Sequence, residues 1–169
     1  MKKILIIEDE EPIRRVLVRI LSEESEDYQI SEEEDGKLGL NRLLKEEFDL
    51  VLCDIKMPKM DGIEALQKAR EKEILVPFIL LTGHGNVAIA VEAMKLGAYD
   101  FILKPPDLNR LLNAVRHALE TKELVTENKI LKKKIAKKYT IIGESKEIDE
   151  IHNLIEKVAP TEARVLITG

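Results

Sequence analysis

Short apolar runs alternate with amphipathic stretches over the first 120 residues of the chain. Five runs of four or five residues predict strands, at 3–7, 28–31, 49–53, 77–81 and 100–103. Between them, apolar residues recur at helical spacing near 12–24, 37–46, 62–72 and 86–96, and a fifth helix is predicted to begin at Asp107. The pattern therefore predicts five consecutive βα units.

Two of the predicted strands, at 49–53 and 77–81, are apolar throughout rather than alternating. Continuous apolar runs are typical of parallel strands that are buried on both faces. Five βα units with such strands predict an α/β fold with a doubly wound parallel sheet. Because ligands of such sheets bind at the carboxyl ends of the strands, we expect the functional residues directly after the strands.

Polar residues stand at these predicted strand ends. Glu8 and Asp9 follow the first strand, Asp54 the third, Thr82 the fourth and Lys104 the fifth. Each is also an ordinary loop or capping residue when taken alone. Together, however, converging carboxylates raise one another's pKa unless a cation balances them. Mg²⁺ suits such a site because it prefers oxygen ligands, and one carboxylate of the cluster can act as a nucleophile.

The helical pattern continues past residue 120, since neither Gly nor Pro interrupts residues 107–142. A 4-3-4 spacing typical of a coiled-coil seam is formed by Leu124, Asn128, Leu131 and Ile135. An Asn at an a position favours a parallel two-stranded coil. Residues 121–139 are therefore predicted to form a helical coiled-coil linker that dimerises the chain.

A new pattern begins at residue 140. Ser145 precedes a helical stretch with Ile148, Ile151, Leu154, Ile155 and Val158 on one face, and residues 164–168 form an apolar run typical of a strand. One helix and one strand cannot bury their apolar faces on each other alone. We therefore expect residues 140–169 to be the first part of a second domain.

Charge and composition narrow the class of protein. The 169 residues carry a net charge of −5, and the acidic excess lies within residues 1–120. No apolar run approaches the roughly 20 residues that span a bilayer, and the acidic turn after the first strand does not fit a signal peptide. The single cysteine, Cys53, excludes a disulfide framework. We expect a cytoplasmic protein without a membrane partner.

Four segments carry a family resemblance: IIEDEEPIRR at 6–15, LVLCDIKMPKMDG at 50–62, ILLTGHG at 79–85 and GAYDFILKP at 97–105. Together they resemble the receiver domain of two-component response regulators. The resemblance covers residues 1–120 and implies a flavodoxin-like sheet of five parallel strands.

The resemblance also implies a phosphorylation site. Asp54 would accept a phosphoryl group from the histidine of a sensor kinase. Mg²⁺ would be held beside it by Glu8, Asp9, Asp54 and the backbone carbonyl of Lys56. Glu8 stands where an Asp is more common in the family, and its longer side chain should preserve Mg²⁺ binding.

Three further residues match the switch of the family. Thr82 would hydrogen-bond the phosphoryl oxygens, and Lys104 would pair with them as a point charge. Phe101 matches an aromatic residue that turns inward when the threonine moves, and Lys104-Pro105 matches a peptide bond that is cis in the family. The pattern assigns no role to the acidic run at residues 32–35.

Residues 140–169 resemble the start of the AAA+ ATPase domain of sigma-54-dependent activators of the nitrogen-regulator type. Gly169 would be the first glycine of the phosphate-binding loop, so we expect this chain neither to bind nor to hydrolyse ATP. The resemblance implies a homodimer that contacts sigma-54 RNA polymerase and DNA only through domains outside this chain.

Two other functions stay open at the level of sequence. A receiver-fold dimerisation module that is not phosphorylated would share the same fold. A Mg²⁺-dependent phosphatase would use the same aspartyl-phosphate chemistry but would need a general acid near Asp54, and residues 54–58, DIKMP, offer no obvious one.

Overall fold

The computed structural model describes residues 1–83, 87–122 and 145–160, and the chain divides into two compact units, Met1–Thr126 and Glu127–Gly169. The strands of the first unit are β1 (Lys2–Ile7), β2 (Tyr28–Glu33), β3 (Leu50–Asp54), β4 (Phe78–Thr82) and β5 (Asp100–Leu103). Its helices are α1 (Glu11–Glu24), α2 (Gly36–Leu43), α3 (Gly62–Glu71) and α4 (Val87–Lys95), followed by a helix described over residues 108–122.

The strands form one parallel sheet in the order β2-β1-β3-β4-β5. Every residue of β3 and β4 is buried, as their continuous apolar sequences predict. The chain leaves β1 in one direction to form β2 and then crosses back to form β3 on the other side. The predicted doubly wound five-stranded fold is therefore confirmed, with its switch point between β1 and β3.

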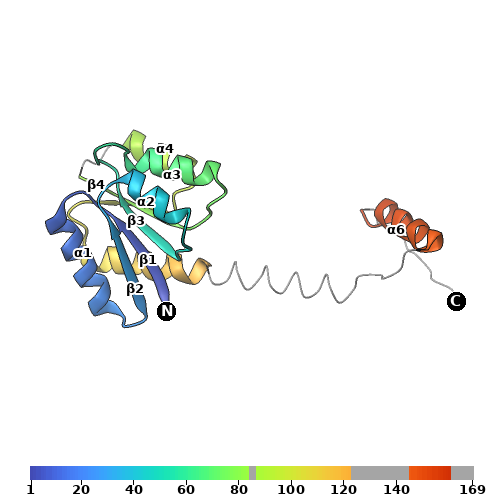
Figure 1. Ribbon diagram of the computed structural model, residues 1–169, viewed down its shortest axis with the longest axis horizontal. Helices are drawn as coiled ribbons and strands as arrows, with labels where there is room; N and C mark the ends of the chain where they lie inside the picture. Colours follow the sequence, from blue (N-terminus) through green and yellow to red (C-terminus); the bar gives the residue numbers. More distant parts are fainter. Residues whose placement is uncertain (84–86, 123–144, 161–169) are drawn as a thin grey trace. The chain divides into compact units, whose positions relative to one another are not determined.

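Helices cover both faces of this sheet (Figure 1). Alternate residues of β1 point to opposite faces, so Ile4 and Ile6 pack with Leu17 of α1 and with Val115, whereas Leu5 and Ile7 belong to the core beneath α2, α3 and α4. The fold is thus a three-layer sandwich in which the sheet contributes to two hydrophobic cores.

Aspartates begin three of the helices. The side chains of Asp35, Asp61 and Asp107 accept hydrogen bonds of 2.8 Å from the backbone amides of Leu38, Glu64 and Arg110. Such N-caps satisfy amides that have no partner within the helix. The start predicted at Asp107 is therefore confirmed, and the caps fix where the loops at the carboxyl edge of the sheet end.

The strands and helices predicted within residues 1–122 are found, with small differences in their bounds. Strand β2 extends to Glu33 because its pairing with β1 continues to Ile7. Asp54 and Thr82 are the last residues of β3 and β4 rather than the first residues of the loops. Helix α2 ends at Leu43, earlier than the amphipathic pattern suggests, because the chain turns back at Leu44 and Lys45.

The described part of the second unit contains α6 (Lys146–Val158), with Ser145 at the N-cap position as predicted. Its apolar residues Ile151, Leu154 and Ile155 are exposed. The proposed seam, Leu124, Asn128, Leu131 and Ile135, lies outside the described residues, as do the predicted strand at 164–168 and Gly169. Among the described helices, none is long and apolar enough to cross a membrane.

Candidate functional site: an acidic cluster at the carboxyl edge of the sheet

The register of the sheet brings the predicted site residues to one edge. Ile7 of β1 pairs with Cys53 of β3, so the residues that follow them, Glu8 and Asp54, lie side by side. Farther along the edge, Thr82 at the end of β4 pairs with Leu103 of β5, the residue before Lys104. Residues separated by up to 96 positions thereby share one site.

Lys104 joins two of the carboxylates. Its Nζ atom lies 2.6 Å from Oε2 of Glu8 and 3.0 Å from Oδ1 of Asp54. The side chain of Lys104 is only 11% exposed, and Glu8 and Asp54 are buried. A buried ion pair of this kind needs good geometry to offset the loss of solvation, and here one ammonium group serves two carboxylates.

Burial sets the protonation chemistry of the cluster. It raises the pKa of Glu8, and the nearby Asp54 carboxylate adds to this shift, although Lys104 opposes it. Burial likewise raises the pKa of Asp54, against the lowering effect of Lys104. For Lys104, burial alone would lower the pKa, but the hydrogen bonds to both carboxylates raise it. The site therefore favours additional positive charge.

A third carboxylate completes the cluster. Asp9, which is exposed, places an oxygen within 4.8 Å of oxygens from both Glu8 and Asp54. Three carboxylate oxygens at this spacing, one of them open to solvent, form a donor set that fits Mg²⁺. The structure thus brings together the three side chains predicted to hold the cation.

The other predicted site residues surround this cluster. Thr82 is buried at the end of β4, and its carbonyl oxygen accepts a 2.7 Å hydrogen bond from the Lys104 amide. Phe101 is partly buried against the core beneath α3 and α4. Lys56 lies in the loop after β3 with an exposed side chain. The Lys104-Pro105 peptide bond is cis, as expected.

Gly62, the first residue of α3, lets this helix approach the end of β3. A Cβ atom at this position would clash with the backbone carbonyl of Asp54. The Gly62 amide also donates a 2.9 Å hydrogen bond to the carbonyl of Ile55. The close approach requires glycine and holds the Asp54 backbone against the helix.

The acidic run at residues 32–35 acquires a structural role that sequence reasoning missed. Glu32 pairs with Arg14 at 3.3 Å, and Glu33 pairs with Arg42 at 3.3 Å. The buried Asp35 caps α2 and pairs with Lys59 at 2.6 Å. Of these contacts, only the cap could have been found from the sequence, because Asp35 directly precedes a predicted helix.

Comparison with known proteins agrees with this geometry. Residues 4–116 match the family described as the response regulator receiver domain. The chain is 34% identical to the C4-dicarboxylate transport transcriptional regulatory protein DctD of Pseudomonas aeruginosa, and 34% identical to the nitrogen assimilation regulatory protein NtrX of Azorhizobium caulinodans. These alignments cover 99% and 98% of this chain but only 37% and 36% of the relatives, so the chain spans less than two fifths of their length.

Solved structures support the same assignment. The chain resembles NtrX from Brucella abortus with a TM-score of 0.72 and 33% identity, over 98% of this chain and 36% of that one. It also resembles a receiver domain protein from Clostridium thermocellum with a TM-score of 0.68 and 30% identity, over 74% of this chain and 99% of that one. The family match spans most of the unit that carries the acidic edge, and the chain therefore belongs to the response regulator receiver family.

Proposed function

We propose that Asp54 is the phosphoryl acceptor of this receiver domain and that a sensor histidine kinase is the donor. The observation that carries the proposal is the position of its carboxylate, at the switch point of the sheet and 3.0 Å from the Lys104 ammonium. A carboxylate can attack phosphorus, and a nearby fixed cation stabilises the charge on the phosphoryl oxygens.

Glu8, Asp9 and Asp54 would hold Mg²⁺, with the backbone carbonyl of Lys56 as a further ligand. The oxygen donors of the cluster and its excess of carboxylates over ammonium groups support this part of the proposal. When bound, Mg²⁺ supplies positive charge that balances the carboxylates and the incoming phosphoryl group.

In the transfer step, one oxygen of Asp54 forms a bond to phosphorus as the bond from phosphorus to the donor histidine breaks. The histidine ring, protonated on its other nitrogen, leaves with the electron pair as neutral imidazole. Lys104 pairs with the phosphoryl oxygens as a point charge, and the Thr82 hydroxyl donates a hydrogen bond to them. The product is an aspartyl phosphate.

The added charge would draw Thr82 toward Asp54 and repack Phe101. The position of Phe101 supports this role, because it is partly buried against the core and lies on β5, which pairs with the strand that ends at Thr82. Such a local change can bias a two-state surface. We propose that it alters a dimer formed through residues 121–139 and thereby controls a sigma-54-dependent activator, whose AAA+ domain begins within residues 140–169. The system would operate in the cytoplasm.

Intact mass measurement after incubation with acetyl phosphate and Mg²⁺ tests the proposal. We expect the wild-type chain to gain the mass of one phosphoryl group and the Asp54→Asn variant to gain none. Asp49→Asn is a matched control, since Asp49 lies at the opposite end of β3, and this variant should be phosphorylated like wild type. Failure of the wild type both to gain this mass and to bind beryllium fluoride would contradict the proposal and favour a dimerisation module.

A further inference from the structure

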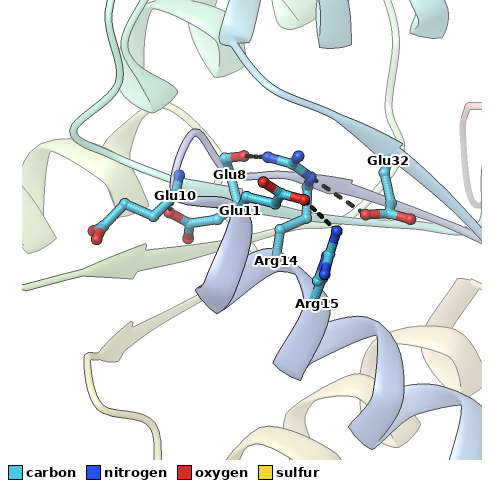
Figure 2. Close-up of polar contacts among 6 residues, drawn as sticks. All are labelled: Glu8, Glu10, Glu11, Arg14, Arg15 and Glu32. Carbon is cyan, nitrogen blue, oxygen red and sulfur yellow. Dashed lines mark hydrogen bonds and ion pairs between the residues drawn. The ribbon is translucent and has the colours of Figure 1, made fainter.

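Arg14 contacts the main chain of the acidic cluster rather than its carboxylates (Figure 2). Its Nη1 atom donates a 2.6 Å hydrogen bond to the backbone carbonyl of Glu8. Its Nε atom pairs with Oε2 of Glu32 at 3.3 Å. The side chain of Arg14 is 16% exposed and its contact with the Glu8 carbonyl is partly buried, whereas the Glu32 side chain is 45% exposed.

The Glu8 carbonyl lies just beyond the paired part of β1, whose register with β3 ends at Ile7 and Cys53. The Glu8 amide donates a 3.1 Å hydrogen bond to the carbonyl of Glu33 on β2. Pairing with β2 therefore holds the amide of Glu8, and Arg14 holds its carbonyl. This fixes the direction in which Glu8 and the following Asp9 leave the strand.

Glu32 fixes the guanidinium in turn. It is carried by β2, which pairs with β1, so its position is set by the sheet. A planar guanidinium can donate to two acceptors in a fixed geometry, which an ammonium group cannot do. Through this contact Glu32, the first residue of the acidic run, orients Arg14.

We propose that Arg14 is a positioning residue for cation binding, acting through the backbone of Glu8 and held in place by Glu32. The proposal rests on the proposed function, because it takes the cluster of Glu8, Asp9 and Asp54 to be the Mg²⁺ site. Mutation of groups that orient metal ligands without touching the metal typically weakens metal binding by on the order of 10–100-fold.

A positioning role and a purely electrostatic role of Arg14 predict opposite changes in Mg²⁺ affinity when the guanidinium is removed. The guanidinium is a positive charge near a cation site, so its removal should tighten Mg²⁺ binding if electrostatics alone mattered. If its role is to position the Glu8 backbone, its removal weakens Mg²⁺ binding instead. The sign of the change in affinity therefore separates the two roles.

Arg15 provides the matched control. It is the next residue of α1, carries the same charge, and pairs only with Glu11 among the described contacts, four positions earlier on the helix (Figure 2). Its side chain is 76% exposed. Exposed pairs of this type contribute little, so replacing Arg15 should leave the cluster unchanged.

Calorimetric titration of the full 169-residue chain with MgCl₂ at constant ionic strength tests the proposal. We expect Arg14→Met to raise the Kd for Mg²⁺ about tenfold, and Arg15→Met to stay within about twofold of wild type. Arg14→Lys retains the charge but not the planar donor geometry, so it should also weaken binding and provides the test if Arg14→Met does not fold.

A second measurement needs no cation. In Mg²⁺-free protein, amide hydrogen exchange at Glu8 and Glu10 should be faster in Arg14→Met than in Arg15→Met. The Glu8 amide donates to the Glu33 carbonyl and the Glu10 amide to the Glu8 carboxylate, and both amides belong to the segment that Arg14 holds. An unchanged or lower Kd in Arg14→Met, or equal weakening in both variants, would overturn the proposal while leaving the proposed function intact. A wild-type chain that does not bind Mg²⁺ would overturn both.

Discussion

An aspartate lies at each end of strand β3 and pairs with a lysine from another element, yet the two pairs differ in chemistry. At the carboxyl end, Lys104 lies between Asp54 and Glu8 and is 11% exposed. Just before the amino end, Lys122 pairs with Asp49 at 2.7 Å and donates to the carbonyl of Phe48, and it is 32% exposed. The same two residue types thus occur in a buried cluster and in a pair that is about one third exposed.

Charge balance separates the two ends. Asp49 pairs with Lys122 and also accepts a 2.8 Å hydrogen bond from the Lys3 amide. Although burial alone would raise the pKa of Asp49, these hydrogen bonds lower it. At the other end, the burial of Glu8 and Asp54 outweighs the effect of Lys104, and their pKa values are raised. The carboxyl end is thus the one at which the carboxylates lack sufficient positive charge, which supports the proposed Mg²⁺ site there.

Removal of Lys104 should have the largest effect on stability. Lys104→Met leaves Glu8 and Asp54 buried without a counter-ion, and breaking a buried pair in this way costs about 3 kcal/mol. We expect the free energy of unfolding, measured by urea titration at pH 7 in EDTA, to fall by about this amount.

Addition of Mg²⁺ is the control for Lys104→Met, because an ion that binds only the folded state stabilises it. Mg²⁺ should restore most of the loss in this variant, since its carboxylates are left without the lysine. A loss in EDTA no greater than that of Lys122→Met would contradict the contrast between the two ends.

The pH dependence of stability should differ in sign between the two aspartates. Because the folded-state pKa of Asp54 is raised, the folded protein takes up this proton first as pH falls, and Mg²⁺-free protein gains stability between the raised value and the ordinary one. Because the pKa of Asp49 is lowered, its contribution is present above the ordinary value and is lost as pH falls through the lowered one.

Urea unfolding across the acidic range, in wild type, Asp54→Asn and Asp49→Asn, measures these contributions. Subtraction of each variant from wild type isolates one carboxyl group from the other acidic residues. We expect slopes of opposite sign for the two aspartates. Slopes of the same sign for the two aspartates would refute the assignment.

The sequence was informative wherever backbone topology alone determines a position. Continuous apolar runs identified β3 and β4, and the convergence of parallel strands then placed Glu8, Asp54 and Lys104 at one edge. No side-chain detail was needed for that step.

Side-chain contacts between elements could not be predicted in the same way. The pairing of Arg14 with Glu32 depends on how α1 lies against β2, and that of Lys122 with Asp49 joins residues 73 positions apart. Charged residues of either sign are common at such surface positions, so no pattern in the sequence distinguishes a paired residue from a solvated one. Apart from the cap at Asp35, the role of the acidic run became clear only from the packing.

The smallest effect is expected at the amino end of β3. Lys122→Met should lower the free energy of unfolding by about 0.5 kcal/mol, because the pair with Asp49 is about one third exposed and such pairs contribute little. Salt should shrink this loss further, since solvent-exposed charges are screened, whereas the loss caused by Lys104→Met should change little with salt. Parallel urea titrations of both variants at low and high NaCl in EDTA measure the difference. An equal response of the two losses to salt would contradict the expected difference in screening between the two lysine pairs. Burial would then not explain why only the carboxyl end of β3 carries the acidic cluster.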